Sequence, residues 1–135
     1  ARNLFEMSDL KVPVLSIMIG EGGSGGALAM AVANEVWMME NAIYSILSPE
    51  GFASILWKDS KKAPEAAKYM KITAHDIYDL HLIERVIPEE EPASSENLPT
   101  IAEDIRHNLD EFLKKYLPVP GDQLAQQRYD RFRRI

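Results

Sequence analysis

Five glycines within residues 20–26 form the part of this sequence whose residue types and spacing are most informative about chemistry. The segment Gly20-Glu-Gly-Gly-Ser-Gly-Gly-Ala27 follows an apolar run at residues 12–19 and precedes an alanine-rich run at residues 27–33. Glycine lets bare backbone approach another group closely. Where a strand leads into a helix, free N–H groups and the positive helix end favour negative charge. The segment therefore predicts a site for an anion or for an oxygen that becomes negative during a reaction.

One interpretation of these glycines is a dinucleotide-binding fingerprint. Gly20, Gly22 and Gly25 have the spacing of that motif. Glu40 follows about 20 residues later, where an acid that binds a ribose is expected. However, the chain turns at Glu40 and Asn41 directly into another predicted strand, with no crossover helix for a parallel βαβ unit. The sequence therefore disfavours this interpretation.

A second interpretation makes Ser24 a nucleophile, because Gly22-x-Ser24-x-Gly26 matches the pattern of a nucleophile elbow. A nucleophilic serine needs a histidine within hydrogen-bonding reach, usually with an acid behind it. The histidines of the chain fall in helical stretches, at positions typical of solvated surface residues, and they are His75, His81 and His107. The sequence thus offers Ser24 no convincing base.

A third interpretation uses only the backbone. The consecutive N–H groups of Gly22 and Gly23, pointing into a cleft at the start of a helix, would bind a carbonyl oxygen as it becomes negative. Such donors stabilise enolates and tetrahedral oxyanions. This mechanism needs no catalytic side chain, which suits a segment without a nearby Lys, Arg or His. The alternative without chemistry is that the glycines only allow a strand and a helix to pack tightly.

Apolar periodicity and turn residues predict the elements that must position this segment. A strand is expected at residues 12–19, and the residues after the glycines predict a short helix that is buried on all sides. Ser48 is expected to cap a helix that has Pro49 at its first position. The other predicted elements, in chain order, are a helix end at 1–10, strands at 35–39 and 42–47, helices at 63–70 and 73–80, a strand at 83–88, a helix at 101–116, and a last segment capped by Asp122.

The composition predicts a packed core and excludes several classes of protein. The chain has 135 residues, of which 46% are hydrophobic, and it begins without Met inside a helical pattern, which favours a fragment of a longer polypeptide. Without cysteine it has neither disulfides nor thiolate metal sites, which agrees with a cytoplasmic location. Charged residues interrupt the apolar stretch at residues 12–39, which therefore lacks the ~20 apolar residues of a membrane span.

The charge distribution also bears on partners. A net charge of −6 argues against nucleic acid as the main partner. Four arginines gather near the C-terminus and are expected to form a solvated helix end, since cations are favourable at the negative end of a helix. They are Arg128, Arg131, Arg133 and Arg134.

Several segments resemble the crotonase-like superfamily and, within it, the carboxyltransferase α subunits of bacterial acetyl-CoA carboxylases. They are IGEGGSGGALA at 19–29, SPEGFASILWKD at 48–59, KAPEAAKYMKITA at 62–74 and LIERVIPE at 82–89, and they occur in the family's order. QQRYDRF at 126–132 is similar to the family's closing helix. The resemblance spans essentially the whole chain, and it implies that the N-terminal half of the subunit is missing.

This resemblance implies an α/β fold of the crotonase type (the ClpP/crotonase fold), which is a spiral of ββα units. The chain would be the C-terminal half of that spiral, followed by C-terminal helices. Residues 1–88 would form a partial crotonase-like carboxyltransferase core, residues 89–97 an acidic linker, and residues 98–135 a C-terminal helical extension.

The resemblance also implies a function. An α subunit of this family pairs with a homologous, zinc-bearing β subunit in an α₂β₂ assembly. The complex moves a carboxyl group from carboxybiotin, held on a separate carrier protein, to acetyl-CoA, giving malonyl-CoA for fatty acid synthesis. Gly22 and Gly23 would be the backbone donors that hold the ureido oxygen of biotin. The isolated chain is expected to be inactive, and the alternatives are a crotonase-fold serine peptidase using Ser24 or a non-catalytic assembly module.

Overall fold

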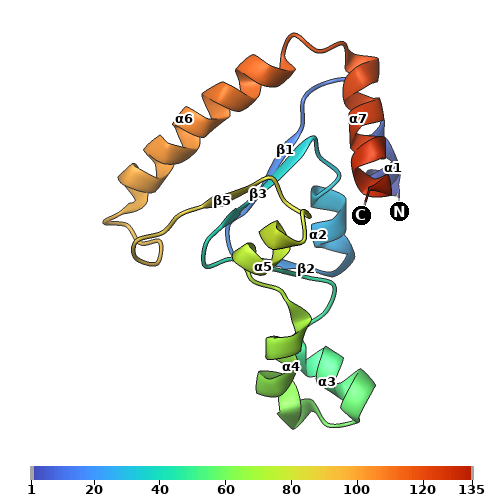
Figure 1. The fold of residues 1–135 in the computed structure, drawn as a ribbon, viewed down its shortest axis with the longest axis vertical. Coiled ribbons are helices and arrows are strands. Elements are labelled where there is room, and N and C mark those ends of the chain that lie inside the picture. The colour runs from blue at the N-terminus through green and yellow to red at the C-terminus, as the bar shows by residue number, and fades with distance from the viewer. Residues whose placement is uncertain (1, 135) are drawn as a thin grey trace.

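Two small parallel sheets form the centre of the fold, and helices surround them (Figure 1). The structure is a computed structural model that describes residues 2–134. In the first sheet the strand order is β1–β3–β5, and in the second β2 pairs with β4. The strands are β1 (Leu15–Met18), β2 (Glu21–Gly23), β3 (Glu35–Met39), β4 (Ile43–Ser45) and β5 (Arg85–Ile87).

The chain alternates between the two sheets. β1 lies in the first sheet, β2 lies in the second, and α2 (Ser24–Met30) follows; β3, β4 and α3 (Pro49–Trp57) repeat this order. The turn at Glu40 and Asn41 therefore moves the chain from one sheet to the other and does not close a hairpin. Two successive ββα units stack in this way, with β1 parallel to β3 and β2 parallel to β4.

The remaining helices cover the sheets and extend from them (Figure 1). α3 and α4 project from one end of the molecule, whereas α6 and α7 form two arms joined at residues 117–120. No helix among residues 2–134 combines the length and the apolar character that crossing a membrane requires. Besides α2 and α3, the helical elements are α1 (Arg2–Ser8), the 3₁₀ turn η1 (Ser60–Lys62), α4 (Ala63–Met70), α5 (Ala74–Asp79), α6 (Leu98–Tyr116) and α7 (Gly121–Arg133).

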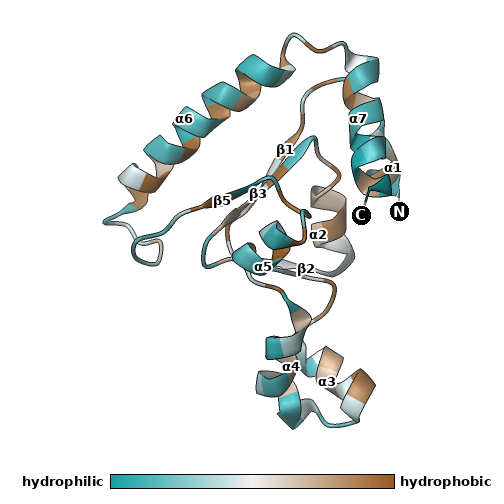
Figure 2. Cartoon of the chain, viewed as in Figure 1, coloured by the Kyte–Doolittle hydropathy of each residue, from teal (hydrophilic) through white to brown (hydrophobic). Residues whose placement is uncertain are grey.

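The core lies on both faces of β3, which is buried at every position. Trp37 is 1% exposed and meets the ring of Phe112 edge-on at 6.2 Å between centroids. Ile101, Phe112 and Tyr116 of α6 belong to the same hydrophobic cluster as the strands. Apolar and polar residues alternate along α6 (Figure 2), as expected for a helix that packs one face on a core.

Local capping signals predicted the helix starts correctly where they were strong. The Ser48 hydroxyl accepts a hydrogen bond from the Gly51 N–H at 3.2 Å, and Pro49 is the first residue of α3. The predicted helix over residues 63–70 has the bounds of α4. Asp122, in contrast, does not cap α7, which begins at Gly121 without a side-chain cap. The Asp122 carboxylate instead pairs with Lys11 at 3.0 Å.

The prediction that the helix after the glycines is buried on all sides is wrong. α2 already begins at Ser24, and Ala27 is its buried residue. Leu28 is 45% exposed and Met30 is 57% exposed. One face of α2 therefore packs on the sheets while the other faces outward.

The prediction of a solvated arginine cluster is wrong for Arg128, which is completely buried in α7. Its guanidinium donates hydrogen bonds to the carbonyl oxygens of Leu10 and Val12 and to Oδ1 of Asn34. The same Asn34 oxygen accepts the Val14 N–H at 3.0 Å. Through Arg128 and Asn34, α7 is attached to the segment that leads into β1.

A second buried polar group, the carboxylate of Glu35, connects β3 to α6. Glu35 is 8% exposed and accepts hydrogen bonds from Trp37 Nε1 at 2.8 Å, Lys115 Nζ at 2.7 Å and the Tyr116 hydroxyl at 3.0 Å. Burial by itself would raise the pKa of Glu35, but the bonds from Lys115, Trp37 and Tyr116 outweigh burial and lower the pKa below its usual value. The ionised form is therefore favoured in the folded chain.

Replacing Glu35 with glutamine is expected to lower the free energy of unfolding near pH 7 by about 1–3 kcal/mol, because a buried charge-assisted network is lost. Since the folded-state pKa lies below the unfolded one, the Glu35 carboxylate stabilises the fold above the unfolded pKa. That stability is lost as the pH falls through the folded-state pKa. Glu35→Gln should therefore make stability less dependent on pH in the acidic range, as measured by urea unfolding at several pH values. The exposed Glu65→Gln variant is the control, and an identical pH profile for Glu35→Gln and the unmodified chain would contradict the expectation.

Candidate active site

The glycine segment joins a strand to a helix, as predicted, but its first half pairs in the second sheet. The Gly20 carbonyl accepts the Ile43 N–H at 2.9 Å. In the register of β2 and β4, Gly22 lies opposite Tyr44 and Gly23 opposite Ser45. Glycine has little strand preference, so β2 carries no local signal of a strand.

The register assigns different directions to the two predicted donors. Residues two apart along a strand direct their backbone groups to the same neighbour. Because the Gly20 carbonyl faces β4, the Gly22 N–H faces β4 as well, whereas the Gly23 N–H faces the opposite edge. β2 is an edge strand of the described two-stranded sheet, so the Gly23 N–H has no strand partner there. Of the two groups, the Gly23 N–H is therefore the one that faces away from β4.

Packing inside the chain does not account for most of these glycines. A Cβ atom added to Gly20, Gly25 or Gly26 would meet no atom within 4 Å, and at Gly23 the nearest atom, Ser45 O, would be 3.9 Å away. Among the described residues no glycine has a positive φ, and Gly23 is extended at φ −132° and ψ 152°. The segment therefore presents open backbone to the outside.

Gly22 is the exception, because a Cβ there would lie 2.9 Å from Met18 Sδ and 3.3 Å from Ile43 O. The same Cβ would be 3.6 Å from the Tyr44 ring. Tight packing of strand and helix, which was the alternative to a catalytic role, thus explains the glycine at position 22. It does not explain the glycines at positions 20, 23, 25 and 26.

Ser24 has the backbone of a strained turn but lacks the partners of a nucleophile. Its φ of 58° is left-handed, an unusual conformation for a residue with a Cβ. Within residues 2–134, no histidine nitrogen is hydrogen-bonded to the Ser24 hydroxyl. His75 Nε2 lies 3.2 Å from Glu40 Oε1, and His107 Nε2 lies 3.8 Å from Glu111 Oε1. The structure does not bring together the groups that a serine nucleophile needs.

The dinucleotide interpretation finds no support in the position of Glu40. Its second carboxylate oxygen accepts the Glu89 N–H at 2.8 Å, and the first contacts His75. This hydrogen bond and the contact with His75 lower the pKa of Glu40 below its usual value. Glu40 therefore connects the end of β3 to the segment after β5, and both of its oxygens already have protein partners.

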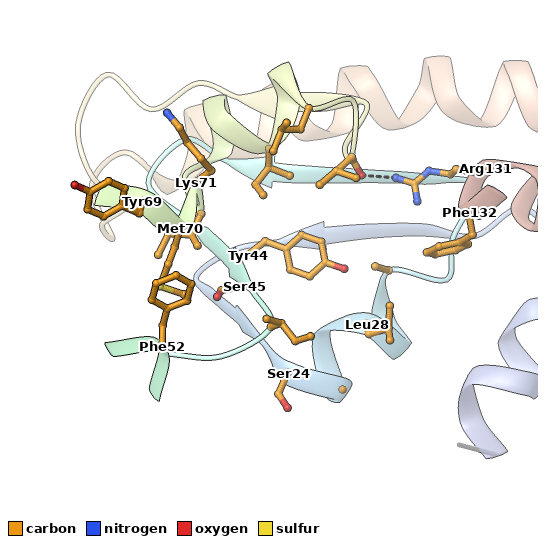
Figure 3. Close-up of a pocket in the computed structure, with 17 residues that line it drawn as sticks. Ser24, Leu28, Tyr44, Ser45, Phe52, Tyr69, Met70, Lys71, Arg131 and Phe132 are labelled. Atoms are coloured by element: carbon orange, nitrogen blue, oxygen red, sulfur yellow. Dashed lines mark hydrogen bonds between the residues drawn. The ribbon is translucent and has the colours of Figure 1, made fainter. Parts of the chain in front are cut away.

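A cavity of about 600 Å³ lies beside the start of α2 (Figure 3). Ser24 and Gly25 line it, but Gly22 and Gly23 do not. Sequence reasoning missed this cavity, because its wall joins residues from β4, α4, α5 and α7 that are far apart in the chain. The side chains of its lining are mostly apolar and include Leu28, Tyr44, Phe52, Tyr69, Met70, Ile72, Ile77, Leu80 and Phe132.

Solved structures with this fold define its class. The chain superposes on a Pseudomonas malonate decarboxylase hetero-dimer with a TM-score of 0.68 and 21% identity, covering 98% of this chain and 55% of that chain. It superposes on transcarboxylase 12S with a TM-score of 0.66 and 20% identity, covering 84% of this chain and 22% of that chain. It superposes on an enoyl-CoA hydratase from Mycobacterium avium subsp. paratuberculosis with a TM-score of 0.56 and 18% identity, covering 93% of this chain and 50% of that chain. The predicted α/β fold of the crotonase type is confirmed.

The family follows from the sequence itself. Residues 1–135 match the family described as acetyl co-enzyme A carboxylase carboxyltransferase-like, and the chain belongs to this family. It is 57% identical over 134 residues to the acetyl-coenzyme A carboxylase carboxyl transferase subunit alpha of Streptococcus pyogenes serotype M5 (strain Manfredo), covering 99% of this chain and 51% of the relative. The corresponding subunit of Streptococcus uberis is 58% identical over 133 residues, covering 98% and 50%. The chain thus spans about half the length of these relatives.

Proposed function

We propose that this chain is part of a carboxyltransferase α subunit of acetyl-CoA carboxylase, which transfers a carboxyl group from biotin to acetyl-CoA to give malonyl-CoA. The observation that carries the proposal is the family match over all 135 residues. The names of the relatives support a β subunit as partner. An α₂β₂ assembly, a separate biotin carrier protein, zinc confined to the β subunit and a cytoplasmic location are further parts of the same proposal.

The glycine segment fits the carbonyl group of biotin. The Gly23 N–H faces away from β4, and the neighbouring glycines leave space where side chains would stand. Biotin, when bound, supplies the carboxyl group. The role of this chain is to donate a hydrogen bond from the Gly23 N–H to an oxygen that gains negative charge. Such preorganised donors make one of the largest contributions to lowering the activation barrier.

Gly22 and Gly23 are both proposed site residues, and the register supports a different role for each. The Gly22 N–H faces β4, and its missing side chain makes room for Met18 and Tyr44. Gly22 would therefore hold β2 in place, and Gly23 would present the donor. This role needs no histidine or carboxylate as a base in this chain.

Ser24→Ala is expected to leave malonyl-CoA formation by the assembled enzyme essentially unchanged, because Ser24 has no hydrogen-bonded histidine among the described residues. Loss of a true serine nucleophile costs on the order of 10⁶-fold in kcat. The assay is malonyl-CoA formation from carboxylated carrier protein, with a fluorophosphonate probe applied in parallel. Stoichiometric labelling of Ser24, with loss of activity in Ser24→Ala, would favour a serine hydrolase instead.

A further inference from the structure

The strand that carries the proposed donor is held from one side. Among the described residues, β2 pairs with β4 and with no other strand. The Ile43 N–H of β4 bonds to the Gly20 carbonyl at 2.9 Å, and Gly23 lies opposite Ser45. Because its sheet hydrogen bonds all go to β4, the glycine strand follows any shift of β4, and the Gly23 N–H moves with it.

The segment between α4 and α5 holds β4 on its other side. The Tyr44 N–H donates to the Ile72 carbonyl at 3.0 Å, and Ile43 forms an antiparallel bridge with Thr73. Ile72 is buried, so water does not compete for this contact. In Figure 3, Lys71 and Tyr44 mark the two adjoining segments. β4 therefore lies between the glycine strand and residues 72–73.

The side chain of Thr73 determines how this segment continues into α5. Its hydroxyl accepts the Asp76 N–H at 3.3 Å, which caps α5, and donates to Asp76 Oδ2 at 2.8 Å. Asp76 Oδ1 also pairs with Lys71 Nζ at 3.1 Å. The hydrogen bond from Thr73 and the ion pair with Lys71 lower the pKa of Asp76. The carboxylate is therefore ionised at neutral pH and accepts both bonds.

The turn into this segment depends on those bonds. Lys71 ends α4 with a left-handed φ of 53°, which is unfavourable for a residue with a Cβ. Such a conformation persists where the surrounding structure holds it. The pairing of Lys71 with Asp76, and of Asp76 with Thr73, joins both sides of Ile72. The position of the Ile72 carbonyl, and with it that of β4, is therefore set by this group of three side chains.

We propose that Thr73 is a positioning residue for carboxyl transfer: its hydroxyl holds residues 71–73 in the conformation that fixes β4, and β4 holds the Gly23 N–H where the developing oxyanion lies. The inference rests on the proposed function, in which the Gly23 N–H is the donor. Thr73 does not line the cavity beside α2, and it acts through backbone contacts alone. Small displacements matter here, because a misplacement of about 1 Å far from the chemistry can cost on the order of 10²-fold in rate.

The test is Thr73→Val, which removes the hydroxyl and keeps the branched shape of an exposed side chain. For the assembled enzyme we expect kcat for malonyl-CoA formation to fall about 3- to 10-fold, as for the loss of one hydrogen bond. The KM for acetyl-CoA should stay constant, since no contact with substrate is removed. Thr73→Ser keeps the hydroxyl and should restore kcat. Thr100→Val makes the same change at an exposed position of α6 and is the control.

Asp76→Asn is the second variant, with assembly of every variant checked by size-exclusion chromatography. It ends the ion pair with Lys71 and leaves the Thr73 hydroxyl a neutral acceptor, which makes a weaker hydrogen bond than a carboxylate. We expect kcat to fall in the same direction as in Thr73→Val, again without a change in the KM for acetyl-CoA.

A double-variant cycle with Gly23→Pro separates positioning from general destabilisation. If Thr73 acts through the Gly23 N–H, Thr73→Val lowers kcat no further once Gly23→Pro has removed that donor. An equal loss in both backgrounds would overturn the inference, and so would an unchanged kcat in Thr73→Val. If Gly23→Pro lowers kcat and Thr73→Val does not, the inference fails and the proposed function stands. Full activity of Gly23→Pro would refute the donor itself, and the inference with it.

Discussion

Replacing Gly23 with proline is expected to lower kcat for malonyl-CoA formation by about 10²–10³-fold, because it removes one preorganised N–H donor from a developing oxyanion. The Gly23 N–H faces away from β4, so proline removes no β2–β4 hydrogen bond, but its φ of about −65° differs from the −132° of Gly23 and shifts the backbone at this residue. The measurement is the rate of carboxyl transfer by the assembled complex, with assembly checked by size-exclusion chromatography. A normally assembled Gly23→Pro complex with unchanged kcat would show that this N–H is not a catalytic donor.

Gly23→Ala is the matched control for that experiment. The alanine keeps the N–H, its backbone at φ −132° and ψ 152° is ordinary for an L residue, and its Cβ lies 3.9 Å from the nearest atom, Ser45 O. The fold should therefore accept it without strain. Because the Cβ would stand where open backbone faces outward, we expect a raised KM for the biotin substrate with kcat retained. A lower kcat in Gly23→Pro would report the loss of the N–H donor, whereas a higher KM in Gly23→Ala would report the loss of space for the substrate.

Replacing Arg128 with methionine is expected to lower the free energy of unfolding by about 3 kcal/mol, since hydrogen bonds from a charged group to buried acceptors are lost. The acceptors left behind are the carbonyls of Leu10 and Val12 and the side chain of Asn34. Arg128→Lys should recover only part of the loss, because one ammonium cannot reproduce the planar, forked donors of a guanidinium. Urea unfolding followed by circular dichroism measures both variants.

The exposed Arg134→Met variant is the control for Arg128 and should change stability by less than about 0.5 kcal/mol. Full stability of Arg128→Met would mean that the cost of burying the guanidinium cancels its hydrogen bonds, as happens for some buried ion pairs. In that case the attachment of α7 would determine geometry without adding net stability.

The elements with strong local signals could be predicted from the sequence. Ser48 and Pro49 defined the start of α3, and the predicted helix at 63–70 has the bounds of α4. The alternation of short strands and helices, together with the family motifs, was sufficient for the fold class. For α3 and α4 the deciding information lies within about one or two helical turns of sequence, whereas the motifs that indicated the fold class are spread over residues 19–132.

The features that the sequence did not reveal depend on contacts between distant residues. Arg128 looks like a surface charge in its own segment, and only its partners, 94 or more residues away, make it a buried one. Gly22 and Gly23 are equivalent by sequence, and the register with β4 distinguishes their N–H groups. The cavity that Tyr44 lines exists only in the folded chain, because its wall combines residues of five helices and one strand.

The attachment of α7 by Arg128 has a consequence for the order in which this chain folds. Its hydrogen bonds join residues separated by 94 to 118 positions, whereas the stacked ββα units form from contacts closer in sequence. Closing so long a loop costs chain entropy before the contact is gained, so α7 is expected to dock last. Since α7 also supplies Arg131 and Phe132 to the cavity wall, the pocket becomes complete only at this final step.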